Sequence, residues 1–230
     1  MIAWSLLDTA EVPGGFGDLR LMKRGDEFSI MSGTTELMNS RLSGSEKALA
    51  DLVCERLGPR VRPRLLIGGL GMGFTLRAAQ AALALDAEIV VVELVPAVIA
   101  WASGPMAGLF GTSLADPRVH LVEDDVGRLI RSGKADYDAI LLDVDNGPGG
   151  LTRAANDGLY DAKGLDATRA ALRPGGLLAV WSSAPDRGFT LRLRKAGFGV
   201  EEIKVRANGK GGGARHVIWI AAKAALVRPR

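Results

Sequence analysis

The sequence is short of the residues that build disulfides, metal sites and membrane spans. Its 230 residues include one cysteine, Cys54, so no internal disulfide can form, and we expect an intracellular, cytoplasmic protein. The two histidines, His120 and His216, lie in strand-like stretches, and no Cys/His cluster has metal-ligand spacing, so no metal is expected. No window approaches about 18 consecutive apolar residues, and the N-terminal "MIAWSLLDTAEVPGG" lacks the basic start of a signal peptide. We therefore expect a globular protein that uses neither a metal nor a membrane.

Aromatic residues are also scarce, at 5% of the chain, and this bears on how its charges can be used. From residue 187 to 230, eleven Lys and Arg stand against two acids, a net charge of +9, whereas the remaining residues sum to −6. A basic end can bind nucleic acid, but few aromatic side chains for base stacking lie among these charges. We interpret the region as a solvated basic face and do not expect nucleic acid to be the main partner.

Two parts of the chain differ in their hydrophobic pattern. Residues 1–42 contain short alternating pieces broken by glycine, with "RGDE" as a hairpin turn, and predict a small N-terminal β region. Residues 43–230 begin with a helical pattern at 45–57, for which Ser43 or Ser45 is the expected cap, and continue as apolar strands in alternation with helices.

This alternation predicts the fold class. Apolar strands separated by helices indicate an α/β fold with a mostly parallel sheet that is covered on both faces. We expect a helix in "GLDATRAALRPGG" that is stopped by Pro174 and Gly175. The last two strands flank "NGKGGG" and predict a C-terminal antiparallel hairpin.

A glycine turn follows the first strand of this sheet, in "LLIGGLGMGFTL" from residue 65 to 76. The phosphate loop of NTPases needs a lysine after its last glycine, and the dinucleotide fingerprint needs a glycine at its sixth position. Phe74 occupies both places and excludes both motifs. The remaining pattern, Gly69, Gly71 and Gly73, fits either a plain tight turn or a seat for another nucleotide-like cofactor.

Acidic residues follow the next two strands. Glu93 ends "IVVVE", and an acid at this strand tip can accept both hydroxyls of a ribose. Asp125 follows the third strand, where a carboxylate can accept from an adenine amine while the adjacent backbone amide contacts a ring nitrogen. Asp125 also suits a helix N-cap, and Asp124 competes for the adenine position.

Asp143 and Asp145 follow the fourth strand, in "LLDVDNGPGG". Carboxylates there can bind a cation, hold an amine or act as a base. Alternatively, they can form hydrogen bonds to the backbone of the turn. Turn chemistry explains Asn146 better than Asp143. We therefore expect reaction chemistry at Asp143.

These segments together carry a family resemblance. The segments concerned are "LLIGGLGMG", "VVVELVPAV", "DPRVHLVEDDV", "YDAILLDV" and "LYDAKGLDATRAALRPGG". Through them, residues 64 to 222 resemble the Rossmann-like class I S-adenosylmethionine-dependent methyltransferase fold, in its spermidine synthase-like (polyamine aminopropyltransferase) branch. The resemblance implies an enzyme that uses S-adenosylmethionine or its decarboxylated form, an amine or other small nucleophile as acceptor, and a homodimer. It implies Asp143 as the catalytic base and Asp145 and Tyr160 as substrate residues. The cofactor-binding set that it implies is Gly69, Leu70, Gly71, Gly73, Glu93, Leu94, Asp124, Asp125, Val126 and Asp143.

The sequence departs from that branch at the substrate end. The branch usually reads Gly-Gly-Gly-Asp-Gly-Gly in the turn, and its aspartate holds the amine of the decarboxylated cofactor; here that place is Gly71. A Tyr-His-Glu-like stretch that lines the polyamine site corresponds to "ELMNSRLSGSEKALADL", which has neither histidine nor tyrosine. Four hypotheses stay open: aminopropyl transfer, methyl transfer to a small molecule, a nucleoside- or partner-binding module without chemistry, and RNA modification.

Overall fold

The computed structural model describes residues 2–14, 17–144, 147–148, 158–209 and 212–225. The N-terminal region is a four-stranded antiparallel sheet of β1 (Ser5–Glu11), β2 (Asp18–Arg24), β3 (Glu27–Ser32) and β4 (Thr35–Asn39), in that order. The hairpin predicted at "RGDE" joins β2 to β3. The predicted division at residues 42 and 43 falls between β4 and the first helix.

A seven-stranded sheet forms the larger part of the molecule. Its strands run in the order β10-β11-β9-β8-β5-β6-β7, and only β11 is antiparallel to its neighbours. The predicted mostly parallel sheet and C-terminal hairpin are confirmed, with β11 inserted between β9 and β10. The strands are β5 (Arg64–Gly68), β6 (Glu88–Glu93), β7 (Val119–Glu123), β8 (Tyr137–Leu142), β9 (Leu172–Ser182), β10 (Gly199–Arg206) and β11 (Arg215–Ala222).

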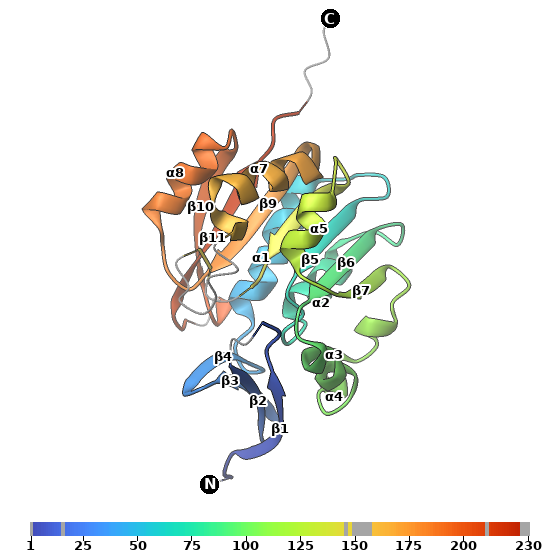
Figure 1. Ribbon diagram of the computed structural model, residues 1–230. Coiled ribbons are helices and arrows are strands. Elements are labelled where there is room, and N and C mark those ends of the chain that lie inside the picture. Colours follow the sequence, from blue (N-terminus) through green and yellow to red (C-terminus); the bar gives the residue numbers. More distant parts are fainter. Residues whose placement is uncertain (1, 15–16, 145–146, 149–157, 210–211, 226–230) are drawn as a thin grey trace, which may run out of the picture.

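Helices cover both faces of this sheet (Figure 1). One face packs on α1 (Gly44–Leu57), α2 (Phe74–Ala82), α3 (Pro96–Ser103) and α4 (Ala107–Phe110), and the other on α5 (Val126–Ser132), α7 (Ala162–Ala171) and α8 (Arg187–Lys195). Alternate residues of β5 are buried in different hydrophobic cores: Leu65 and Ile67 pack on the first face of the sheet, and Leu66 packs on the second. This alternation explains why the parallel strands are apolar throughout. Among the described residues, no helix is both long and apolar enough to span a bilayer.

One local prediction is wrong, and a second is confirmed only in part. The helix expected to stop at Pro174 ends at Ala171, because Leu172 already pairs with Tyr137, and Pro174 lies in the irregular register before Leu177 pairs with Ala139. Ser43 occupies the N-cap position of α1, as expected, but its side chain makes no capping hydrogen bond, and the Ser45 hydroxyl donates to Glu46.

The position of a ligand site follows from the strand order. The chain builds outward from β5 through β6 to β7 and then returns to β8 on the other side of β5, so the order reverses beside β5. In open α/β sheets ligands bind at the carboxyl ends of strands near such a reversal. In Figure 1 the blue N-terminal sheet lies below the larger sheet. Its Val12, Leu19 and Ile30 share a hydrophobic core with the first face.

Candidate active site

Two adjoining cavities lie between the N-terminal sheet and the carboxyl edge of the larger sheet. The first, of about 140 Å³, lies over the ends of β6 and β7 and is here named the β6–β7 cavity; its acidic lining residues are Glu93, Asp124, Asp125 and Asp143. The second, of about 80 Å³, is named the α1 cavity. It is lined by Leu37, Met38, Asn39, Glu46, Leu70, Gly71, Met72, Phe74, Asp143 and Trp181. Met38, Gly71 and Asp143 line both cavities and lie where they meet.

The glycine turn brings backbone close to this junction. Gly69 has φ +91°, and a Cβ there would lie 2.5 Å from the Asp143 carbonyl oxygen, so only glycine fits. Gly71 has φ +49°, and a Cβ would lie 2.9 Å from Met38 Sδ. A Cβ on Gly73 would lie 2.3 Å from the ring of Phe110, and Gly73 lines neither cavity. Two of the predicted glycines therefore border the cavities, whereas the third permits helix packing.

Glu93 holds the turn in place. Its carboxylate accepts hydrogen bonds of 2.9 Å from the backbone amides of Leu70 and Val95. Burial raises the pKa of Glu93, and these amide donors oppose the shift. The side chain is 8% exposed and faces the β6–β7 cavity, so it is a structural clamp as well as a cavity residue.

The two aspartates after β7 have different hydrogen-bonding partners. Asp125 Oδ1 accepts from the Gly127 amide over 2.6 Å, so Asp125 is the N-cap of α5 that the sequence allowed. Asp124 accepts from the Asp125 amide through Oδ1 and pairs with Arg128 through Oδ2, at 3.1 Å. Both line the β6–β7 cavity together with Leu94 and Val126. Among the described residues, Asp125 Oδ2 has no hydrogen-bond partner, whereas both oxygens of Asp124 are engaged.

Asp143 lies directly after β8, at the junction of the cavities. Its amide donates to the Gly68 carbonyl over 3.0 Å, and its Oδ2 accepts from the Thr75 hydroxyl over 2.6 Å. Burial, and after it the negative charge of Glu46, together raise the pKa of Asp143 to about 7, although the Thr75 hydrogen bond opposes the shift. A carboxyl that titrates near neutral pH beside a cavity is suited to act as a general base.

Glu46, in the first turn of α1, is the second acid of the site and was not among the residues predicted for it. The Ser45 hydroxyl donates to Glu46 Oε2 over 2.8 Å and lies 2.9 Å from His216 Nδ1. Burial raises the pKa of Glu46. The only sequence signal is position, because Glu46 lies in the stretch that corresponds to the polyamine-site segment of the resembled branch.

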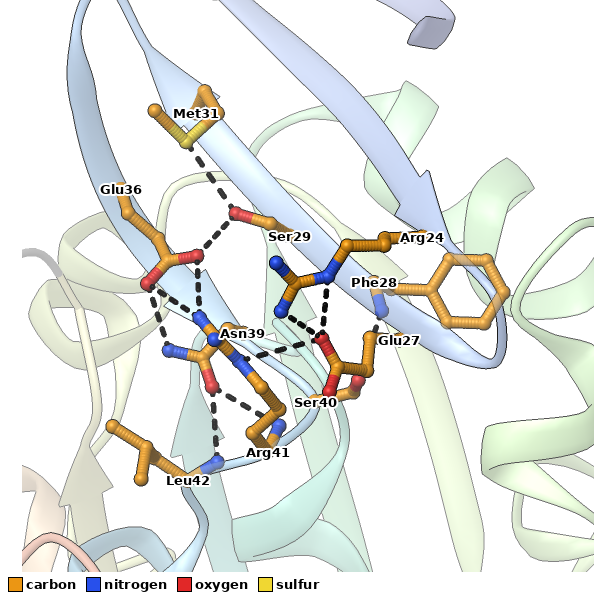
Figure 2. A network of polar contacts seen from close by, with 10 residues as sticks. All are labelled: Arg24, Glu27, Phe28, Ser29, Met31, Glu36, Asn39, Ser40, Arg41 and Leu42. Atoms are coloured by element: carbon orange, nitrogen blue, oxygen red, sulfur yellow. Dashed lines mark hydrogen bonds and ion pairs between the residues drawn. The ribbon is translucent and has the colours of Figure 1, made fainter. Parts of the chain in front are cut away.

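Other parts of the α1 cavity come from distant segments. Asn39 ends β4, and its side chain is hydrogen-bonded to Glu36 through the amide nitrogen and to the Arg41 and Leu42 amides through the oxygen (Figure 2). Phe74 begins α2 and Trp181 lies near the end of β9. The cavity therefore combines apolar walls with two acids that approach each other from α1 and β8.

Some predicted residues lie elsewhere. Tyr160 is 4% exposed and packs edge-on against Phe189, at 5.6 Å between ring centroids, in the core beneath α8. It lines neither cavity, so we leave it out of the site. Asp145 lies outside the described residues. Within the described ranges, no three His, Cys, Asp or Glu side chains gather as metal ligands.

The fold and the cavities define a class of protein: a Rossmann-like sheet of the methyltransferase type with two adjoining cavities at its carboxyl edge. Comparison with known proteins then gives particular relatives. No family model matches the chain. The polyamine aminopropyltransferase of Mycobacterium tuberculosis (strain H37Rv) is 33% identical over 164 residues, which cover 67% of this chain and 30% of the relative. That of Mycobacterium bovis matches to the same extent. The chain thus spans about a third of the length of these curated relatives.

Solved structures show the same likeness in fold. The spermidine synthase of Thermotoga maritima superposes with a TM-score of 0.73 at 17% identity, over 96% of this chain and 74% of that one. A probable spermidine synthase from Corynebacterium glutamicum gives 0.63 at 15% identity, over 97% and 82%. A precorrin-6y methyltransferase from Geobacter metallireducens gives 0.51 at 16% identity, over 76% and 88%. The predicted resemblance and the predicted fold class are confirmed.

Proposed function

We propose that the protein is a spermidine synthase-like transferase, which moves an aminopropyl group from a nucleoside sulfonium to an amine. The observation that carries this proposal is the position of Asp143, a carboxyl with a pKa of about 7 at the junction of two cavities. The β6–β7 cavity then binds the nucleoside, and the α1 cavity binds the acceptor. The curated relatives, named polyamine aminopropyltransferases, support the same reaction class.

The β6–β7 cavity suits a nucleoside. Glu93 would accept from the ribose hydroxyls and Asp125 from the adenine amine, beside the backbone of Leu94 and Val126. The fit rests on the turn, where Gly69 and Gly71 line the cavity and pack closely against Asp143 and Met38, and on a buried carboxylate that faces the cavity. S-adenosylmethionine or its decarboxylated form, when bound, supplies both the alkyl group and its thioether leaving group.

The protein's own contribution is to position the acceptor and to remove one proton. The acceptor nitrogen attacks as a neutral amine, a C–N bond forms as the C–S bond breaks, and the nitrogen then loses a proton. Thr75 fixes Asp143 Oδ2, so Oδ1 is the oxygen that takes this proton. The apolar walls of Leu37, Met38 and Phe74 exclude water from the reacting atoms.

The remaining predictions belong to the same proposal. We propose a cytoplasmic protein that acts as a homodimer, as the resembled branch does, without a metal, a membrane or nucleic acid as a partner.

Product analysis tests the reaction class. The purified protein is incubated with S-adenosylmethionine or its decarboxylated form, each with putrescine or another primary amine, and products are identified by mass spectrometry. We expect methylthioadenosine from the decarboxylated form. S-adenosylhomocysteine as the product would instead establish methyl transfer. If neither nucleoside raises the melting temperature, the assignment of the cofactor cavity is wrong.

A further inference from the structure

The last strand of the N-terminal sheet carries one extra residue where it borders the two cavities. In the ladder between β3 and β4, Ile30 pairs with Met38, and the next residue, Met31, pairs with Glu36. Leu37 is therefore an added residue, which makes this part of β4 a β-bulge. In a regular strand neighbouring side chains point to opposite faces, and a bulge interrupts that alternation.

The bulge places two neighbouring apolar side chains on the same face of the sheet. Leu37 and Met38 both line the β6–β7 cavity and the α1 cavity, and Ile30, the partner of Met38, also lines the first. Glu36 lies on the other face, where it accepts a hydrogen bond of 2.7 Å from the Ser29 hydroxyl (Figure 2). Leu37 and Met38 therefore form one apolar wall, which we name the bulge wall.

The bulge wall lies against the glycine turn at the junction of the cavities. Met38 Sδ lies 2.9 Å from the position that a Cβ on Gly71 would take, so the sulfur packs against the turn. Among the described residues, the four that line both cavities are Leu37, Met38, Gly71 and Asp143. Asp143 is the only one of them with a charged side chain. The junction is therefore bounded mainly by apolar groups, which distinguish ligands by size.

We propose that the bulge wall sets the length of the alkyl group that the enzyme transfers. The inference rests on the proposed function, in which the sulfonium lies in the β6–β7 cavity and the attacking nitrogen in the α1 cavity. The carbon that passes from sulfur to nitrogen then lies at the junction, and the rest of its chain lies beside Leu37 and Met38. A longer chain must displace Met38 from the turn, and a closely packed wall resists such a displacement.

Two sulfonium donors with the same ammonium end test the proposal. They are decarboxylated S-adenosylmethionine, which carries an aminopropyl group, and its homologue with an aminopentyl group. One methylene in a hydrophobic pocket changes kcat/KM by about 10–200-fold, so with putrescine as acceptor the wild type should favour the aminopropyl donor by at least about 100-fold. Met38→Ala shortens the wall and should lower this ratio at least about tenfold, because kcat/KM for the longer donor rises.

Met31→Ala is the matched control. Met31 lies beside Ile30 in β3, its sulfur accepts a hydrogen bond from Ser29 on the face that carries Glu36, and it lines neither cavity. This variant should keep the wild-type ratio of the two donors. If Met38→Ala slows both donors by the same factor, or if Met31→Ala lowers the ratio as much, the inference is overturned while the proposed function stands.

Leu37→Ala gives a second test on the other half of the bulge wall, which holds even where Met38→Ala does not fold. It should also lower the preference for the aminopropyl donor, again because the longer group gains room at the junction. An unchanged ratio in the folded Leu37→Ala protein would overturn the inference, since the extra residue of the bulge would then have no part in the selection.

Calorimetric titration of the two donors without an acceptor separates this inference from the proposed function. If no alkylated amine forms, the proposed function fails. The inference then stands only if the wild type binds the aminopropyl donor more tightly than the aminopentyl donor and Met38→Ala lowers that preference at least about tenfold. Without that change in binding, the inference fails as well.

Discussion

The two cavities differ in how their polar atoms are used. In the β6–β7 cavity the carboxylates of Glu93, Asp124 and Asp125 are already bonded to backbone amides, so their geometry is fixed before any ligand arrives. In the α1 cavity two acids, Glu46 and Asp143, have raised pKa values, and the charge of Glu46 contributes to the shift of Asp143. The β6–β7 cavity is therefore organised to hold the nucleoside of the proposed cofactor, and the α1 cavity to bind the acceptor amine and remove its proton.

Asp143→Asn should separate the cavities most sharply. Loss of the base should lower kcat by about 10²–10⁴-fold, while nucleoside affinity stays within a factor of about two. The measurements are steady-state turnover and calorimetric titration of methylthioadenosine. Asp161→Asn, at the N-cap of α7 and away from both cavities, is the control. Turnover at the wild-type rate would remove Asp143 as the base.

Glu93→Gln should damage the β6–β7 cavity. Glutamine keeps one acceptor oxygen for the two amides of Leu70 and Val95, so the glycine turn loosens and nucleoside affinity falls about tenfold. The free energy of unfolding should fall by about 1–3 kcal/mol, as for other buried donors left unsatisfied. Glu88→Gln, at the far end of β6, controls for the loss of a charge. Equal losses of nucleoside affinity and of unfolding free energy in both variants would show that the Glu93 carboxylate does not stabilise the glycine turn.

The pH dependence of stability should reveal Asp143 directly. Its folded pKa of about 7 lies above the ordinary value of 3.8, so its contribution to stability is fully present below about pH 4 and is lost as the pH rises through 7. Asparagine does not ionise and still accepts from Thr75. From pH 5 to pH 8 the melting temperature of Asp143→Asn should therefore rise relative to wild type. Parallel curves would place the carboxyl's pKa near its ordinary value.

Glu46→Gln should have the smallest effect, a shift of the pH profile. Removing a neighbouring negative charge lowers the pKa of Asp143, so the rising limb of kcat against pH moves to lower pH. The measurement compares the midpoints of this limb with a saturating acceptor. A shift to higher pH would show that Glu46 does not act on Asp143 through its charge.

The sequence allows much of the β6–β7 cavity to be predicted, because its residues follow consecutive parallel strands. Glu93 and Asp143 each come directly after an apolar run, Asp125 follows the end of β7, and parallel strands bring these ends to one edge. The mostly parallel sheet follows from the same pattern. What the pattern could not show is that Glu93 is also a clamp on the turn, since this depends on the path of the backbone amides.

The α1 cavity could not be predicted in this way. Its key residues are Met38, Glu46 and Trp181, from β4, α1 and β9, and no local motif links them. Each also has an ordinary local explanation: Met38 is an apolar residue in a strand, Glu46 is an acid in the first turn of a helix, and Trp181 is an aromatic residue in a strand. Tyr160 shows the opposite case: its place in the sequence suggested a site residue, whereas its ring packs against Phe189 and lines neither cavity.

The contact between Gly71 and Met38 constrains the order in which substitutions can be accepted. An aspartate at 71, as the resembled branch has, would need a left-handed backbone at φ +49° and would place its Cβ 2.9 Å from Met38 Sδ. Shortening Met38 first removes the obstacle, whereas introducing the aspartate first forces Met38 aside. The two positions are therefore an epistatic pair. A library that varies them together can reach combinations that stepwise changes starting from residue 71 would discard.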